Sequence, residues 1–118
     1  MEHDPKALQI LFRAAAPPDL ELTFRPMFGG IIAYAQGKPL ASLSKVGLAL
    51  KAPPALMAEF LAAPDATPLR YEPNSPASKS YVVVPPAVMA DRDSLRGWIM
   101  KSVDALAAAP AKMVKAKR

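Results

Sequence analysis

Proline is the feature that most restricts how this chain can fold, since 14 of its 118 residues are proline. Proline fixes φ, lacks an amide N–H and disfavours a helical conformation in the residue before it. Three Pro-Pro pairs, at 17–18, 53–54 and 85–86, divide the chain into short segments. Each segment can therefore be assigned from its own hydrophobic period.

The segment before the first pair predicts a helix. Asp4 can accept hydrogen bonds from first-turn amides, and Pro5 suits the first helical position. Apolar residues then recur at helical spacing until Pro17-Pro18 stops the pattern; they are Ala7, Leu8, Leu11, Phe12 and Ala15.

Residues 20–51 predict an antiparallel meander, because the apolar period changes to two and no connection is long enough for a parallel crossover. Leu20, Leu22 and Phe24 alternate with polar residues in the first strand. Gly29-Gly30 breaks that strand. The expected strands that follow are 31–34, 39–43 and 46–51, joined by turns at Gln36-Gly37 and Ser44-Lys45.

The rest of the chain predicts two helices and two short strands. A helix follows Pro53-Pro54, a brief strand is expected at 69–72, and the unbroken apolar run 81–84 indicates a strand covered on both faces. The last helix is amphipathic, capped by Asp91 or Asp93 and ended by Pro110. Its apolar face comprises Leu95, Trp98, Ile99, Ser102, Val103, Leu106 and Ala107.

The order of these elements predicts an α+β fold. An antiparallel meander sheet would carry the N-terminal, middle and C-terminal helices against one face and an edge. The length is typical of one domain, which we place at residues 1–109. The exposed edge strand of such a sheet also leaves room for a homodimer.

The net charge of +5 is concentrated in one place. Residues 1–109 hold eleven basic and ten acidic side chains, whereas residues 110–118 hold four basic and no acidic ones. A lysine-rich terminus is typical of a disordered, solubilising tail. The alternative is a phosphate-contacting arm that binds nucleic acid weakly. Its candidate contacts are Lys101, Lys112, Lys115, Lys117 and Arg118.

Composition argues against catalysis. The chain has no cysteine and one histidine, His3, near the N-terminus. Disulfides, thiol catalysis, histidine triads and multi-histidine metal sites are therefore excluded. We expect no enzymatic activity, no cofactor and no metal. No run of 18 apolar residues could span a bilayer, and the N-terminus lacks a hydrophobic signal core, so we expect a cytoplasmic protein without a membrane partner.

The polar clusters favour structural roles. Gly29-Gly30 lacks the spacing and the following helix of a phosphate-binding loop. Asp91 and Asp93 fall where a helix N-terminus needs acids. Serines around Lys79, at 75, 78 and 80, would allow a serine–lysine dyad but are more typical of a solvated loop.

The stretch around Met27-Phe28 is the least usual in the chain. Two apolar side chains beside two glycines are typical either of core plus turn or of an exposed contact site for a protein partner. The candidate contact patch comprises Arg25, Met27, Phe28, Gly29 and Gly30.

The same stretch carries a family resemblance. Arg25-Pro26-Met27-Phe28-Gly29-Gly30, followed by Gly37-Lys38 and Leu50-Lys51, is similar to the N-terminal domain of the TfoX/Sxy regulators of bacterial competence for DNA uptake. Ser80–Pro85, then Val88, Asp91 and a helix with Trp98, agree with this family as well. The resemblance covers roughly residues 5 to 107.

The resemblance implies a non-enzymatic α+β regulatory domain that works by protein–protein contact in transcription regulation. Its implied partner is a transcription factor such as the cyclic-AMP receptor protein. Full-length family members add a C-terminal helical domain, whereas here only the basic tail follows Ala109. Gln36 and Leu40-Ala41 depart from common family residues but are expected to leave the fold unchanged.

Overall fold

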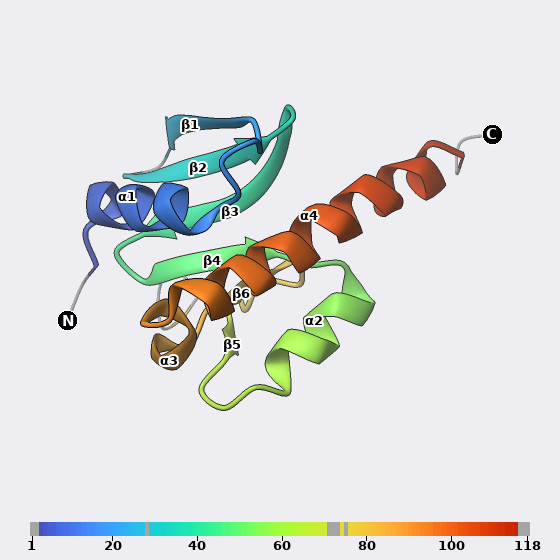
Figure 1. Cartoon of the computed structure of the whole chain (residues 1–118). Coiled ribbons are helices and arrows are strands. Elements are labelled where there is room, and N and C mark those ends of the chain that lie inside the picture. The colour runs from blue at the N-terminus through green and yellow to red at the C-terminus, as the bar shows by residue number, and fades with distance from the viewer. Residues whose placement is uncertain (1–2, 28, 71–73, 75, 116–118) are drawn as a thin grey trace.

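A computed structural model shows one six-stranded antiparallel sheet with helices before, between and after the strands (Figure 1). It describes residues 3–27, 29–70, 74 and 76–115, the last eight of these as backbone only. The strand order is β1-β2-β3-β4-β6-β5. The strands are β1 (Leu22–Met27), β2 (Gly30–Ala35), β3 (Lys38–Ser44), β4 (Gly47–Lys51), β5 (Thr67–Pro68) and β6 (Tyr81–Val83). The helices are α1 (Pro5–Ala15), α2 (Pro54–Leu61), α3 (Pro86–Met89) and α4 (Arg92–Lys115). The predicted α+β class is confirmed.

Helix α1 begins where the sequence predicts. Asp4 Oδ1 accepts a hydrogen bond from the Lys6 amide at 3.1 Å, and Pro5 occupies the first helical position. The buried face of the helix carries Leu8, Phe12 and Ala15. Phe12 is fully buried and meets Phe24 of β1 edge-on, with ring centroids 6.3 Å apart. This contact fixes α1 against the β1–β2 hairpin.

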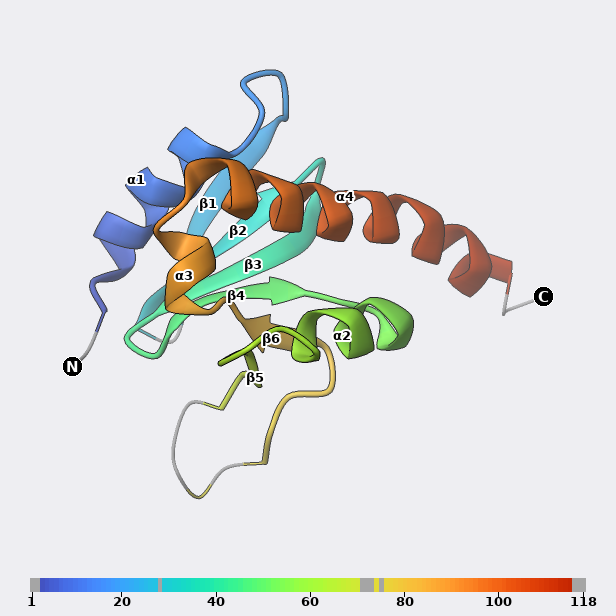
Figure 2. The same ribbon diagram turned by 60° about the horizontal axis from the view of Figure 1, so that its bottom comes forward.

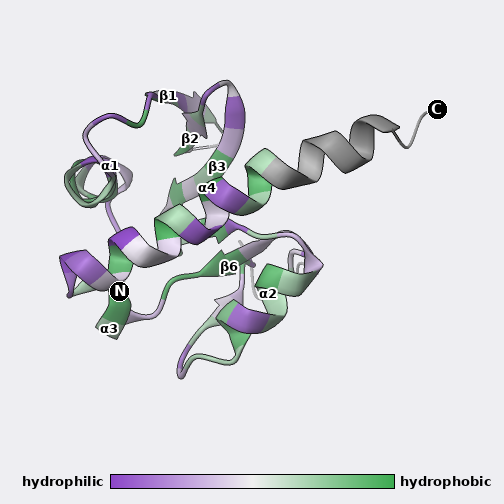
Figure 3. Ribbon diagram, turned by 45° about the vertical axis from the view of Figure 1, so that its right-hand side comes forward, coloured by the Kyte–Doolittle hydropathy of each residue, from purple (hydrophilic) through white to green (hydrophobic). Residues whose placement is uncertain are grey.

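Helices α1 and α4 cover the same face of the sheet, and α3 lies beside them (Figures 1 and 2). Cross-strand partners share a face, so the pairs Ala33–Ala41, Ala41–Leu50 and Leu50–Val82 trace one apolar row under the helices. Leu95 and Ile99 of α4 are fully buried against this row. In Figure 3 the strands under α4 are mainly hydrophobic, whereas hydrophobic and hydrophilic residues alternate along α4.

Helix α2 closes the far end of the core against β6 and α4. Phe60 of α2 and Trp98 of α4 stack face to face, with ring centroids 4.2 Å apart. Trp98 is therefore the anchor that the periodicity of the last helix indicates. Asp91 also behaves as predicted, because its carboxylate accepts hydrogen bonds from the Asp93 amide and the Ser94 hydroxyl at the start of α4.

Three sequence-based expectations are wrong in detail. Helix α4 continues through Pro110 to Lys115, so Pro110 does not end it. The brief strand expected at 69–72 lies earlier, at Thr67–Pro68. The run 81–84 buries Val82 and Val84 but leaves Tyr81 and Val83 half-buried, so its two faces are not equally covered. Near the N-terminus, the His3 amide donates a hydrogen bond to the Lys45 carbonyl, in the turn between β3 and β4, at 2.9 Å.

Candidate functional site

The candidate contact patch lies at the tip of the β1–β2 hairpin. Arg25 and Met27 are in β1, Gly30 opens β2 opposite Met27, and Gly29 lies in the turn between them. Phe28 lies outside the described residues. Met27 is one of two large hydrophobic side chains that the described part of the chain exposes, with 40% of its surface accessible. The sequence leaves open whether this residue belongs to the core or to the surface, and the structure places it on the surface.

Arg25 and Met27 lie on the sheet face turned away from α1. Cross-strand pairing places Arg25 with Ile32 and Met27 with Gly30, on the side opposite Phe24. The Arg25 guanidinium lies 5.7 Å from the centroid of the Tyr34 ring. At an exposed site such a cation–π contact contributes about 0.5–1 kcal/mol, so it orients the guanidinium without burying its charge.

Each of the two glycines in the patch is required for a different structural reason. Gly29 has φ +79, a left-handed conformation that the hairpin turn requires and that side chains rarely adopt. Gly30 has no such φ, but a Cβ at this position would lie 2.6 Å from the Leu43 carbonyl oxygen of β3. The Gly-Gly pair thus forms the turn and lets β2 approach β3 closely.

A cavity of about 480 Å³ adjoins the hairpin tip on its helical side. The hairpin contributes an apolar wall, and the first turns of α1 contribute the polar groups of Asp4, Lys6 and Gln9. The volume lies within the range of ligand pockets. The lining residues from the hairpin are Phe24, Pro26, Gly29, Gly30 and Ile31. An apolar wall facing a few polar groups suits an inserted apolar side chain better than a highly charged ligand.

A sequence model of the TfoX N-terminal domain matches residues 20–106, which is most of the chain. The chain belongs to the TfoX N-terminal domain family. No curated protein and no solved structure matches it. The match includes all six strands and begins after α1, so the cavity lies between the family-matched hairpin and a helix that precedes the matched range.

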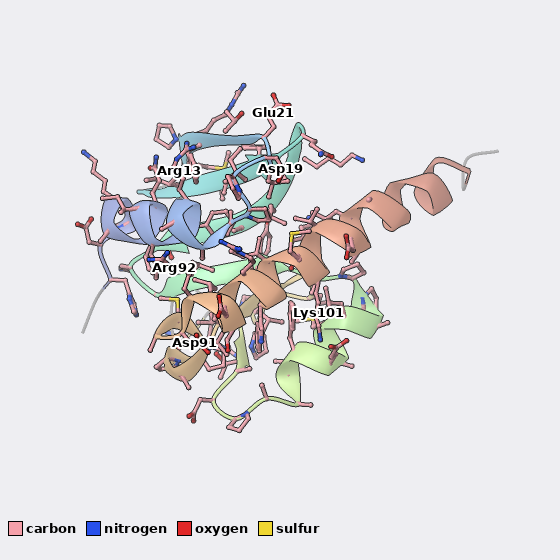
Figure 4. All side chains as sticks on the ribbon, viewed as in Figure 1. Arg13, Asp19, Glu21, Asp91, Arg92 and Lys101 are labelled. Carbon is pink, nitrogen blue, oxygen red and sulfur yellow. The ribbon has the colours of Figure 1, made fainter. Side chains whose placement is uncertain are left out.

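The basic residues proposed to contact nucleic acid are only partly described in this TfoX N-terminal domain protein. Lys101 forms an ion pair with Glu59 of α2, and Figure 4 shows its side chain directed toward that helix. Both side chains are 53% exposed, so the pair contributes little to stability. The backbone of Lys112 and Lys115 belongs to the last turns of α4. Lys117 and Arg118 lie outside the described residues.

The serine-rich loop before β6 has a structural role at Ser78. Its Oγ accepts hydrogen bonds from the amides of Ser80 and Tyr81, at 3.1 and 3.0 Å. This geometry holds the start of β6 and uses the hydroxyl as an acceptor, unlike a nucleophile activated by Lys79. Ser75 lies outside the described residues.

Sequence reasoning missed two features of this TfoX-family chain. The first is Ser102, assigned to the apolar face of the last helix, whose fully buried Oγ has no hydrogen-bond partner among the described residues. The second is a cavity of about 360 Å³ beside His3, lined by both polar and apolar side chains. Residues from four separate stretches of the chain meet there, so no local motif indicates it. They include Gly47, Asp65, Val83 and Met89.

Within residues 3–27, 29–70, 74 and 76–115, no group of three or more acidic or histidine side chains is placed to hold a metal ion. In the same ranges, no helix has the length and apolar character needed to cross a bilayer.

Proposed function

We propose that this protein is a non-enzymatic regulatory module that acts by protein–protein contact in transcription regulation. Membership of the TfoX N-terminal domain family supports this proposal, because the family is not a known enzyme family. The resemblance to competence regulators indicates the process, namely control of genes for DNA uptake in a bacterium. The protein would then act in the cytoplasm.

The observation that carries the proposal is the exposed Met27 at the edge of the hairpin tip. Buried in a partner, a methionine side chain contributes about 1.5–3 kcal/mol of hydrophobic free energy. Its flexible thioether also adapts to irregular apolar surfaces. Met27 and the cavity lie on opposite faces of the hairpin tip. A partner that grips the tip would therefore cover Met27 on one face and insert an apolar side chain into the cavity on the other, where Asp4 and Lys6 are available for polar contacts. An apolar anchor with a recess and a polar rim is typical of protein interfaces.

The partner that the family resemblance favours is a transcription factor such as the cyclic-AMP receptor protein. In this arrangement the hairpin tip and the start of α1 form the contact surface. The domain would alter promoter activity without touching the DNA bases itself.

The test is binding of the purified protein to the purified cyclic-AMP receptor protein, measured by calorimetry. We expect Met27→Glu to weaken binding by about tenfold or more, since it places a charge in an apolar contact. Ile10→Glu is the matched control, because Ile10 is also a large exposed hydrophobic side chain, at 72%, but belongs to α1 and not to the hairpin tip. It should leave both the binding constant and the melting temperature unchanged.

Two results would contradict the proposal. The wild-type protein would show no binding to the receptor protein, or Met27→Glu and Ile10→Glu would weaken it equally. Because both side chains are exposed, the melting temperatures of the variants should match that of the wild type, and binding is compared at equal folded concentration.

Nucleic-acid binding through the basic tail is the alternative function. Its support is the charge of residues 110–118 and the contribution of Lys112 and Lys115 to the last turns of α4. The ion pair of Lys101 with Glu59 detracts from it, because that lysine already has an acidic partner.

A further inference from the structure

The outer edge of β1 is the longest strand edge left without a neighbour among the described residues. The sheet ends at β1 on one side and at β5 on the other. Strand β5 has only two residues, one of them Pro68, whereas β1 has six. Figure 1 shows β1 at the rim of the sheet, with α1 in front of the sheet and not beyond the strand. Such an edge presents unpaired amides and carbonyls to a second strand.

The hydrogen bonds around β1 show which backbone groups point outward. The Gln36 amide donates to the Glu21 carbonyl at 3.3 Å, so Glu21 turns its carbonyl toward β2. Backbone groups alternate along a strand, and therefore those of Thr23 and Arg25 also face β2. The groups of Leu22, Phe24 and Pro26 face outward. Pro26 has no N–H, and because this position faces outward, its absence costs no hydrogen bond between β1 and β2.

We propose that two copies of this protein pair antiparallel through β1, with the two-fold axis at Thr23. In this register the amides of Leu22 and Phe24 donate to the carbonyls of Phe24 and Leu22 of the second copy. At each end Leu20 lies opposite Pro26. The Leu20 amide already donates to the Pro17 carbonyl at 3.1 Å, and Pro26 has no amide, so no donor is left unpaired.

The side chains of this register are complementary. Glu21 of each copy lies opposite Arg25 of the other, which creates two ion pairs on the face turned away from α1. Both residues are exposed, and Figure 4 shows Glu21 projecting from the rim of the sheet. Thr23 lies opposite Thr23 at the axis. On the helical face, half-buried Leu22 and Phe24 meet each other across the interface.

Neighbouring registers lose these contacts. A two-fold axis at Phe24 places Glu21 opposite Met27 and separates the charges. An axis at Arg25 places two guanidinium groups opposite each other. An axis at Leu22 places Leu20 opposite Phe24 of the second copy. The Leu20 amide cannot donate to that residue, because it already donates to the Pro17 carbonyl. The axis at Thr23 alone combines paired donors with paired charges. Of the contact patch only Arg25 belongs to the paired residues 21–25, whereas Met27, Gly29 and Gly30 lie outside them. The dimer does not depend on the proposed function, because its test is the mass of the protein without any other partner.

The first experiment exchanges the charges and measures mass by sedimentation. The wild type should form a dimer of two 12.6 kDa chains. Glu21→Arg and Arg25→Glu should each weaken dimerisation by about tenfold or more, because two ion pairs become two like-charge pairs. A mixture of the two variants should form a heterodimer, and the double variant should dimerise again. A wild-type chain that stays monomeric overturns the proposal, as does a mixture that fails to associate.

The second experiment uses the absence of cysteine from the natural sequence. Thr23→Cys places two thiols opposite each other at a non-hydrogen-bonded pair, where Cα atoms lie about 4.5 Å apart and a disulfide fits. Under mild oxidation this variant should form a covalent dimer at least about tenfold faster than Thr67→Cys. Thr67 is the matched control, because it is an exposed threonine on the opposite edge strand β5. Equal rates for the two variants would overturn the proposal, because they would show that Thr23 of one copy does not lie opposite Thr23 of the other.

Discussion

At the residue scale, the two glycines of the hairpin are needed for different reasons. The turn requires a positive φ at Gly29, where a Cβ would meet nothing within 4 Å. At Gly30 the backbone conformation is ordinary, and the Leu43 carbonyl oxygen of β3 occupies the space that a Cβ would need. Sequence reasoning predicts the turn, but it cannot predict the second reason, because Leu43 is thirteen residues away along the chain.

We expect Gly30→Ala to lower the free energy of unfolding by about 2 kcal/mol or more, because β2 and β3 must separate to admit the methyl group. Chemical denaturation measures the change. Gly97→Ala is the control, since Gly97 lies in α4 with open space around it, and there the change should stabilise by about 0.5–1 kcal/mol. A Gly30→Ala variant as stable as the wild type would contradict the close approach of the two strands.

Two serines should respond in opposite directions to replacement by alanine. Ser102 buries a hydroxyl that has no hydrogen-bond partner in the described part of the chain, so Ser102→Ala removes a desolvation cost and should stabilise by about 1 kcal/mol. Ser78 accepts two backbone hydrogen bonds, so Ser78→Ala should destabilise by about 1 kcal/mol. Urea unfolding curves test both. Two changes of the same sign would contradict one of these assignments.

At the element scale, the predictable parts are those with a strong local signal. Asp4-Pro5 and Asp91 predict the starts of α1 and α4, and the two-residue apolar period predicts the meander. Helix α3 is not predictable, because its four residues make a single turn, too short to show a helical period. The position of β5 is not predictable either, because its two residues are defined by pairing with β6, which follows later in the chain. Pro110 does not mark the end of α4, because the missing proline N–H removes one intrahelical hydrogen bond but the helix continues to Lys115.

The candidate site was predictable to a lesser extent. The unusual Met27-Phe28-Gly29-Gly30 stretch identifies the hairpin tip from sequence. The cavity beside it depends on α1 packing against the hairpin, through the contact of Phe12 with Phe24. No local pattern indicates which helix lies next to a given hairpin, so only the tertiary structure defines the second wall of the site.

Helix α1 precedes the family match, which begins at residue 20, so its packing against the sheet needs a separate test. We expect Phe12→Ala to destabilise by about 3–5 kcal/mol, because Phe12 is fully buried between the helix and the sheet. Ile10→Ala on the same helix should change the stability by less than about 0.5 kcal/mol, since Ile10 is 72% exposed. Thermal unfolding measures both. Equal effects at the two positions would mean that α1 does not pack through the face described.

At the scale of the whole molecule, the two candidate surfaces lie at opposite ends. The hairpin tip lies near the start of α1, whereas the C-terminal turns of α4 project beyond the other side of the sheet (Figure 1). Among the described side chains of α4, Leu106 is the last that packs against the core, and it is also the last residue of the family match. The regulatory surface and the basic terminus can therefore be separated experimentally without disturbing the core.

Deleting residues 110–118 is the change that separates the two functions. It removes four basic residues and no acidic ones, and it leaves every α4 residue that packs in the core among the described side chains. We expect the shortened protein to keep its melting temperature and its affinity for the cyclic-AMP receptor protein. Loss of receptor binding on deletion would show that the protein contact lies at the terminus and not at the hairpin.

The same deletion tests nucleic-acid binding. If the tail contacts four phosphates, the logarithm of the binding constant of the full chain for duplex DNA should fall with the logarithm of the salt concentration with a slope of about −3.6, and the deletion should abolish this binding. DNA binding that survives the deletion would exclude the tail as the nucleic-acid contact.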